Sequence, residues 1–238
     1  MRLGAGYGYK APSLFISEAD EIHFRGVEPI VPSEFDAEES KGMNFDINHH
    51  LEIAEGKTLK SNLLLFYTEI NNTIQVAEVG EKNVFTQLDD PVKTRGLELN
   101  LIFGYHDFRY FVGYTYVDAV RQTSTGDIDL SLVSKHRFNN VLVWERENNF
   151  RIGLEAYYFS KQGRENDTAG ESYWIFGLMT EKKIGRSTTA FLNFENFTDT
   201  RQTKHESINR ADLISPDFRD VYAPLDGFVV NGGFRVEW

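Results

Sequence analysis

The sequence predicts an all-β protein, a portion of an antiparallel transmembrane β-barrel with about ten strands. Three observations lead to this fold class. Residues 227–238 alternate between apolar and polar side chains and end on Trp238. Short and long connections alternate between the expected strands, and 14% of the residues are aromatic. Strands with one apolar and one polar face, joined by unequal connections at their two ends, are typical of outer-membrane barrels.

The composition agrees with a barrel and disfavours other classes. Mean hydropathy is −0.41. The longest apolar run, Leu63–Tyr67, is far shorter than the roughly 20 residues that a membrane-spanning helix needs. The chain has no cysteine, which is compatible with the oxidising bacterial envelope. A formal charge of −11 disfavours nucleic acid and anionic membrane surfaces as partners.

The connections form two classes. Short turns, rich in Gly, Asn and Asp, are expected at Ala54–Lys57, Tyr105–Asp107, Glu145–Asn149 and Ile184–Arg186. Long loops are expected at Ala11–Lys41, Ala77–Lys93, Arg121–Ser134, Gln162–Glu171 and Thr198–Asp226. If the chain ends on the periplasmic side, every short turn lies in the periplasm and every long loop outside the cell. No linker, repeat or low-complexity tract divides the chain, so residues 1–238 are expected to form one domain.

Period-two patterns assign a lipid-facing side to several strands. The expected lipid-facing rows are Leu97, Leu99, Leu101, Phe103 and Tyr105; Tyr110, Val112, Tyr114 and Tyr116; and Phe150, Ile152, Leu154, Ala156 and Tyr158. The segment Asn62–Ile70 is apolar on both sides, so its orientation stays open. Aromatic girdles are expected from Trp238 and Tyr105 on the periplasmic side, and from Tyr116, Tyr158 and Trp174 on the other.

Five segments resemble, in order, elements of the TonB-dependent outer-membrane receptors. Gly8-Tyr9-Lys10-Ala11-Pro12 resembles a Gly-Phe-Arg-Ala-Pro segment, and Glu39-Ser40-Lys41-Gly42 resembles a Glu-x-x-Gly strand opening. The other three are Leu65-Phe66-Tyr67-Thr68-Glu69-Ile70 with Ile74, Thr94-Arg95-Gly96-Leu97-Glu98, and Asn196-Phe197-Thr198-Asp199. The family more often has Arg at the position of Lys10. The resemblance is to the C-terminal half of the barrel, and residues 194–203 with 223–227 are similar to Bacteroidetes-type receptors.

The resemblance implies a barrel of 22 strands, an N-terminal plug domain and a TonB box. Because the chain begins directly with the strand-like pattern Arg2–Tyr9, the plug and the N-terminal strands are expected to be absent from it. The implied function is TonB-dependent uptake of a scarce nutrient such as an iron–siderophore complex, haem, cobalamin or an oligosaccharide. The implied partners are outer-membrane lipid and lipopolysaccharide, the plug, the TonB complex, the barrel assembly machinery and the nutrient. No cofactor is implied.

The sequence contains no recognisable catalytic or metal-binding motif. His49 and His50 are adjacent on an expected strand and point to opposite faces, so they do not share a metal ion through that strand. Asp127 and Asp129 lack the downstream glutamate of a calcium loop, and a solvated loop is the more frequent reading of such a pair. No Gly-x-Ser-x-Gly elbow surrounds any serine. The chain is therefore not expected to be an enzyme.

Ligand contact is expected in the long loops, because loops on a rigid scaffold usually carry recognition. The candidate contact residues are His23, Arg25, Arg201, His205 and Arg210, whose side chains suit carboxylates or catecholates. The same residue types also make loops soluble, which is the more frequent role of any one of them. Phe234, Val236 and Trp238 are the expected insertion signal that the barrel assembly machinery reads.

Two alternatives remain at this stage. A self-contained small outer-membrane barrel, acting as a passive pore or an enzyme, would have to close on about ten strands. A soluble β-sandwich is harder to reconcile with the expected rows of exposed Tyr and Leu, because soluble proteins rarely expose large apolar patches.

Overall fold

The computed structural model describes residues 1–13, 15–16, 26–80, 82–164, 168–211, 214 and 218–237. Within them the chain is built from antiparallel strands and two 3-10 turns, η1 (Pro32–Glu34) and η3 (Gln202–Lys204). The strands are β1 (Arg2–Lys10), β2 (Glu38–Ala54), β3 (Lys57–Asn71), β4 (Ile74–Val79), β5 (Lys82–Gln87), β6 (Val92–Tyr105), β7 (Phe108–Thr123), β8 (Gly126–Asp129), β9 (His136–Arg146), β10 (Phe150–Phe159), β11 (Tyr173–Ile184), β12 (Thr188–Glu195) and β13 (Val229–Val236).

Ten strands follow one another in a single hydrogen-bonded order, β1-β2-β3-β6-β7-β9-β10-β11-β12-β13. This confirms the predicted antiparallel all-β fold and its strand number. The registers place apolar residues opposite apolar ones, as in the pairs Tyr114↔Phe138 and Leu154↔Leu178. A shift by one residue would turn every side chain to the other face, so this pattern fixes the register.

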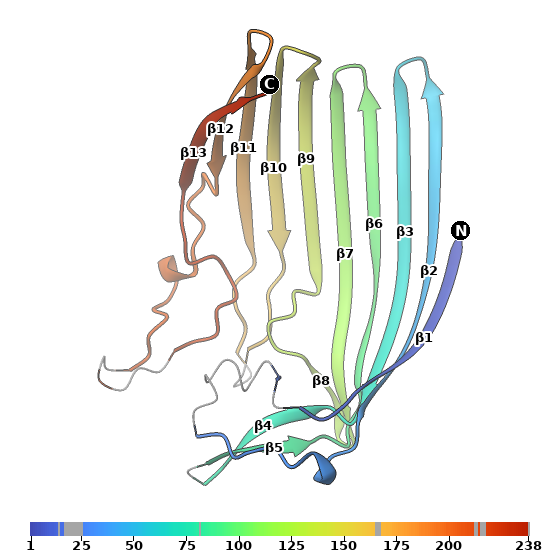
Figure 1. The fold of residues 1–238 in the computed structure, drawn as a ribbon, viewed down its shortest axis with the longest axis vertical. Coiled ribbons are helices and arrows are strands. Elements are labelled where there is room, and N and C mark those ends of the chain that lie inside the picture. The colour runs from blue at the N-terminus through green and yellow to red at the C-terminus, as the bar shows by residue number, and fades with distance from the viewer. Residues whose placement is uncertain are drawn as a thin grey trace. The chain divides into compact units, whose positions relative to one another are not determined.

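The four predicted short turns are all present. They join β2 to β3, β6 to β7, β9 to β10 and β11 to β12, and they lie together at the top of Figure 1. Gly56 and Gly185 have φ of +69° and +72°, as tight reversals require. Because neighbouring strands are antiparallel, the long connections fall at the opposite ends of the strands.

Each strand has an apolar and a polar face. On β10 the apolar face carries Leu154, 46% exposed, and the polar face carries Glu155 and Tyr157. The structure also orients Asn62–Ile70, which the sequence left open. Asn62 donates to Asn48 on β2 (2.9 Å), and Tyr67 donates to Glu69 (2.9 Å). Asn62 and residues two apart from it on β3 therefore lie on the polar face with Asn48, and Tyr67 and Glu69 lie on the opposite face.

The chain divides into two compact units. The first comprises residues 1–46, 65–96 and 118–130, and the second residues 47–64, 97–117 and 131–238. In the described residues, no helix has the length and apolar character needed to cross a membrane.

Two of the loops contain strands that the sequence analysis missed. Residues 77–93 were expected to be a loop, but β4 and β5 form a separate two-stranded sheet there. In the loop expected at 121–134, β8 pairs with the end of β7, so Asp127 and Asp129 are strand residues rather than loop residues. Both hairpins are short, and Gly80 and Gly126 at their turns have positive φ. The expected first loop is also shorter, because β2 begins at Glu38.

Candidate functional site

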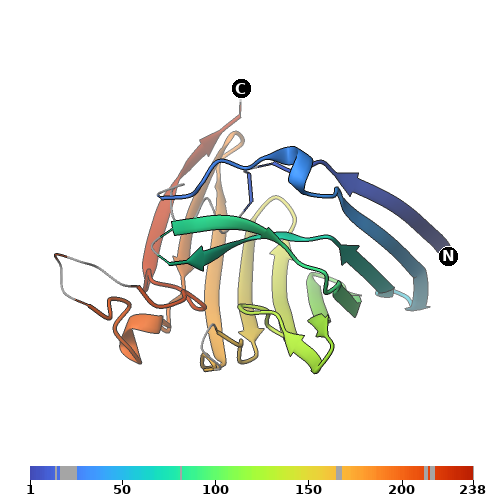
Figure 2. The same cartoon turned by 90° about the horizontal axis from the view of Figure 1, so that it is seen from below.

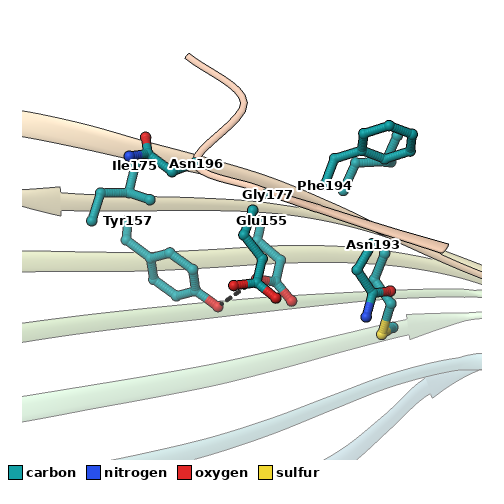
Figure 3. Close-up of a pocket in the computed structure, with 10 residues that line it drawn as sticks. Glu155, Tyr157, Ile175, Gly177, Asn193, Phe194 and Asn196 are labelled. Atoms are coloured by element: carbon teal, nitrogen blue, oxygen red, sulfur yellow. Dashed lines mark hydrogen bonds between the residues drawn. The ribbon is translucent and has the colours of Figure 1, made fainter. Parts of the chain in front are cut away.

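The polar face of the second unit carries a shallow cavity of about 330 Å³ over β10, β11 and β12. Figure 3 shows Glu155, Tyr157 and Asn193 around it. The cavity exists because β11 has Gly177 at this level. A Cβ there would lie 3.2 Å from Glu155 Oε2, so the carboxylate of Glu155 extends across the glycine. Tyr157 donates a hydrogen bond to it (3.1 Å).

Glu155 and Glu195 are the acidic residues of this cavity. Asn231 donates to Glu195, and Tyr157 donates to Glu155, but both donors are neutral. In the described part of the chain, neither carboxylate has a basic side chain within ion-pair distance. The cavity therefore presents two anionic groups without cationic partners and suits a positively charged group.

Nearer the short turns, the polar face carries a row of alternating charges. Arg109 and Arg151 both contact Glu145, at 3.1 and 2.7 Å. Arg151 and Arg235 both approach Glu181, at 3.9 and 3.4 Å. The row crosses β7, β9, β10, β11 and β13. Since its charges are mutually paired, it is less suited to bind an external ion than the cavity.

In the long connection before β13, residues 196–228, the described residues are organised around a buried glutamine that the sequence analysis did not single out. Gln202 has no exposed surface. Its carbonyl oxygen accepts the N–H groups of Tyr222 (2.9 Å) and Ala223 (3.3 Å). Its amide nitrogen donates to Glu206 (2.9 Å) and to the carbonyl of Asp220 (2.8 Å). Every hydrogen-bonding site of the side chain is therefore occupied.

An ion pair joins this connection to the one between β10 and β11. Arg164, whose side chain is 10% exposed, makes two hydrogen bonds to Glu206, at 3.0 and 2.5 Å. Its guanidinium also stacks on Tyr222, 4.5 Å from the ring centroid. The hydrogen bond from Arg164 holds the pKa of the Glu206 carboxyl below its ordinary value. Glu206 thus stays charged in moderately acidic solution.

The Asn-Phe-Thr-Asp segment shapes the exit from β12. Asn196 and Asp199 both have positive φ, 47° and 55°, which Asn and Asp tolerate better than most residues. The Asn196 side chain bonds both the N–H and the carbonyl of Thr200 (2.9 and 2.8 Å). Asp199 accepts the N–H of Phe228, and a Cβ on Gly227 would lie only 1.9 Å from its carboxylate. The motif therefore positions the start of β13.

Two of the described candidate contact residues, Arg201 and Arg210, have partners within the loop. Arg201 pairs with Asp199 at 2.9 Å, and Lys204 reaches the same carboxylate at 2.8 Å. The hydrogen bond from Lys204 lowers the pKa of Asp199. Arg210 donates to the carbonyl of Phe218 (2.8 Å), and His205 is exposed at the end of η3. His23 and Arg25 lie outside the described residues, so ligand contact by the five residues stays a prediction.

The residues that sequence reasoning missed are polar and distant in sequence. Gln202, Glu206 and Arg164 lie in segments without periodicity, and the Arg164–Glu206 contact spans 42 positions. Only the spacing of Gln202 and Glu206, four residues apart, is a local signal, and it does not show which groups they bind.

In the first unit, the two long connections 11–37 and 72–91 share a small apolar core. Ile16 and Ile74 are buried, with Ile30, Phe35, Val76 and Phe85 packed against them. Gln87 exchanges hydrogen bonds with the main chain of Asp36 (3.0 and 2.8 Å), and Glu28 donates from its N–H to Asn83. Figure 2 shows the β4–β5 hairpin in green beside the first connection in blue. We call this assembly the loop cap.

The apolar face of the second unit ends in aromatic residues at both ends of the strands. Towards the long connections, Tyr158 packs on Trp174 (5.0 Å between centroids), and Tyr116 packs on His136 (5.2 Å). Towards the short turns, Trp144 packs on Phe108 and Phe150. The predicted girdle residue Tyr105 ends β6 there and is 51% exposed. Phe234 and Val236 lie exposed on β13, and Trp238 lies outside the described residues.

The described residues contain no group of three His, Asp or Glu side chains placed to hold a metal ion. His49 and His50 are successive residues of β2 and therefore point to opposite faces, as predicted.

Comparison with solved structures shows the same fold in iron receptors. The ferric enterobactin receptor of Pseudomonas aeruginosa, solved with enterobactin, aligns with a TM-score of 0.72 and 15% identity over 98% of this chain and 38% of its own. The FrpB iron transporter of Neisseria meningitidis aligns with a TM-score of 0.67 and 13% identity over 98% and 36%. The ferric-catecholate import receptor Fiu from K12 E. coli gives 0.59 and 18% over 85% and 28%.

This chain spans about a third of the length of those receptors. A search of curated proteins finds no match. The family model described as "TonB dependent receptor-like, beta-barrel" matches residues 1–197. Proteins of this kind are outer-membrane receptors rather than enzymes, in agreement with the sequence analysis. The chain belongs to the family of TonB-dependent receptors, with its strands in the β-barrel of the bacterial outer membrane.

Proposed function

We propose that the chain is the C-terminal part of the barrel of a TonB-dependent transporter and takes part in the uptake of a scarce nutrient across the outer membrane. It supplies part of the barrel wall and the ligand-binding extracellular loops. The observation that carries the proposal is the difference between the two ends of the strands. One end has four short turns, whereas the other has long connections folded around ordered cores.

The polar face supports a plug domain as a partner inside the barrel. The carboxylates of Glu155 and Glu195 at the 330 Å³ cavity fit cationic side chains of such a domain. A passive water-filled pore needs no ordered partner on this wall. The TonB complex is a proposed partner through that plug.

An iron chelate is the nutrient class with the most support. One solved neighbour is titled as a ferric enterobactin receptor in complex with enterobactin, and another as a ferric-catecholate import receptor. The exposed His205 and Arg210 are compatible with an anionic catecholate. Haem, cobalamin and oligosaccharides are the alternatives. A protein ligand is a further proposal for this end, since one neighbour is solved with pyocin S2.

Lipid, lipopolysaccharide and the barrel assembly machinery are proposed partners of the apolar face and of β13. Phe234 is 72% exposed on that strand, as a residue read by an insertion machinery has to be. Removal of Trp238 from the intact receptor is expected to lower its level in the outer membrane more than its affinity for nutrient. Unchanged outer-membrane levels after that removal would contradict this role.

The proposal is tested by uptake in iron-starved cells that carry the intact receptor as their only outer-membrane iron receptor. Ferric enterobactin, haemin and cyanocobalamin are the probes, each with and without a functional TonB. The proposal expects accumulation of one probe, lost without TonB. TonB-independent equilibration of small solutes would instead favour the alternative, a self-contained passive pore, and failure of all three probes in cells that display the receptor would exclude these nutrients.

A further inference from the structure

The backbone of Tyr222 is held at both its N–H and its carbonyl by glutamine side chains. Gln202 accepts its N–H (2.9 Å), while Gln162 donates to its carbonyl (3.0 Å). Tyr173 donates to the same carbonyl (3.0 Å). Gln162 and Gln202 are 6% and 0% exposed, and Tyr222 is 6% exposed. The contacts join positions 60 and 20 residues apart, so the three residues bring two separate connections together.

The Tyr222 ring is closely packed by its neighbours. A Cβ on Gly170 would lie 2.6 Å from the ring, so glycine at this position allows the ring to pack against the backbone. The guanidinium of Arg164 covers the ring from another side. The residues around Tyr222 therefore define one placement of residues 220–223.

The pattern of donors and acceptors around Gln202 requires a neutral amide. Its oxygen faces two N–H groups, whereas its nitrogen faces the Glu206 carboxylate and the Asp220 carbonyl. A carboxylate in the same place would keep the first two bonds but would face two acceptors on its other side. The charged groups near it are Glu206, with Arg164 and Arg219 bound to its carboxylate, and Asp220.

We infer that Gln162 and Gln202 form a clamp on the Tyr222 backbone that presets residues 220–223, ahead of β13, in one conformation for ligand recognition. Gln202 is a positioning residue of this clamp and acts only as an uncharged amide. The clamp deepens the proposed function, on which its link to ligand rests. Presetting a loop improves affinity because binding then does not have to order it.

The first test does not depend on ligand. Hydrogen exchange at Tyr222 and Ala223 is compared, after correction for intrinsic rates, in the intact receptor at pH 7.5 and pH 5. The variants are Q202E, Q202A and the control T203E, which adds the same charge at the next, exposed residue. At pH 7.5 we expect corrected exchange at least tenfold faster than in wild type for Q202E and Q202A. T203E is expected to exchange at the wild-type rate.

The comparison of the two pH values distinguishes a specific requirement for a hydrogen-bonding amide at position 202 from a simple loss of packing. Burial and the neighbouring carboxylate raise the pKa of a glutamate at position 202, so at pH 5 a protonated side chain can again donate to Glu206. Glu206 itself stays charged there because its pKa is lowered. Q202E is therefore expected to regain protection at pH 5, while Q202A is not. Equal exchange in wild type and both variants, or the absence of recovery at pH 5, would overturn the clamp.

The second test uses ferric enterobactin binding to the same receptors at both pH values. We expect Q202E to bind about tenfold more weakly than wild type at pH 7.5 and to recover at pH 5. If exchange follows the prediction but no variant changes affinity, the clamp exists and its role in recognition is wrong. If wild-type receptor does not bind this probe, the proposed catecholate class fails, while the exchange result still decides the clamp.

Discussion

The described residues of the loop cap and of the connection before β13 are held in place by different forces. In the loop cap, Ile16 and Ile74 are buried, and four partly buried apolar side chains pack against them. In the connection before β13, the fully buried side chain is Gln202, and Asn196, Tyr222 and Ala223 are also less than 9% exposed. Gln162, 6% exposed, reaches Tyr222 from the connection between β10 and β11. One region is a miniature hydrophobic core, and the other is a network of hydrogen bonds and one well-buried ion pair.

This difference predicts different responses to change. An apolar core loses stability through cavities and is insensitive to pH, whereas a polar network loses stability when one partner is removed and another is left unsatisfied. A polar network also has stricter geometry, because each donor needs an acceptor at hydrogen-bonding distance. The connection before β13 is thus better suited to hold a single fixed conformation, and the loop cap is better suited to tolerate substitution of similar volume.

The largest expected effect is a cavity in the loop cap. Ile74 is 3% exposed, so Ile74→Ala should lower the free energy of local unfolding of β4 and β5 by about 2–4 kcal/mol. Hydrogen exchange of the hairpin amides measures this loss, with Val79→Ala, at a position 61% exposed, as the control. An effect no larger than that of the control would show that the apolar cluster does not hold the loop cap together.

The next effect is loss of the Arg164–Glu206 pair. Glu206→Gln leaves a guanidinium that is 10% exposed without its carboxylate, which should cost about 1–3 kcal/mol in the connection before β13. The double variant with Arg164→Met should cost less than the sum of the two single variants, because it removes both charges. Exchange at residues 220–223 reports the energies, and strictly additive values would contradict a direct coupling.

Acid should weaken the connection before β13 but not the loop cap, and its effect should be smaller than that of the substitutions above. The pKa of Glu206 is lowered by Arg164, and that of Asp199 by Lys204. Each pair therefore contributes fully above the ordinary carboxyl pKa, about 4, and its contribution is lost as pH falls through the lower folded-state value. Corrected exchange at residues 202–206 should rise below about pH 4, while that of Val76 and Phe85 stays constant. A parallel rise in both regions would point to general acid unfolding.

The smallest expected effect comes from Asp199. Its carboxylate is shared by Arg201, Lys204 and the N–H of Phe228, yet these ion pairs are largely open to solvent. Asp199→Asn keeps a residue that tolerates φ of 55° and retains one acceptor. Exchange at Phe228 should increase slightly, and less so in high salt, which already screens the pairs. A change as large as that from Glu206→Gln would reverse the ranking of the two sites.

The contrast also explains what the sequence could predict. Period-two alternation located the strands, since a residue such as Leu154 has to alternate with Glu155 if one face is apolar. Gly and Asn located the turns, because Gly56 and Gly185 adopt positive φ. The hairpin β4–β5 was missed although Ile74, Val76 and Phe85 are spaced as strand residues, because the short strands were read as part of a long extracellular loop.

The polar network could not be predicted in the same way. Gln162 and Gln202 are residue types common on surfaces, and their burial depends on partners 60 and 20 positions away. Arg201 was chosen as a ligand contact on charge alone, yet it pairs with Asp199 only two positions before it. Charge and residue type therefore indicate that a loop is polar, but they do not distinguish groups that bind ligand from groups that bind one another.

Recognition by the long loops requires above all that the two long-loop regions are folded before ligand binds. Hydrogen exchange of the ligand-free intact receptor in detergent, resolved at residues 74–87 and 220–223, tests this directly. We expect protection of at least about a hundredfold in both regions, lost selectively in the first by Ile74→Ala and in the second by Glu206→Gln. Exchange at the rate of an unstructured peptide in either region would contradict it.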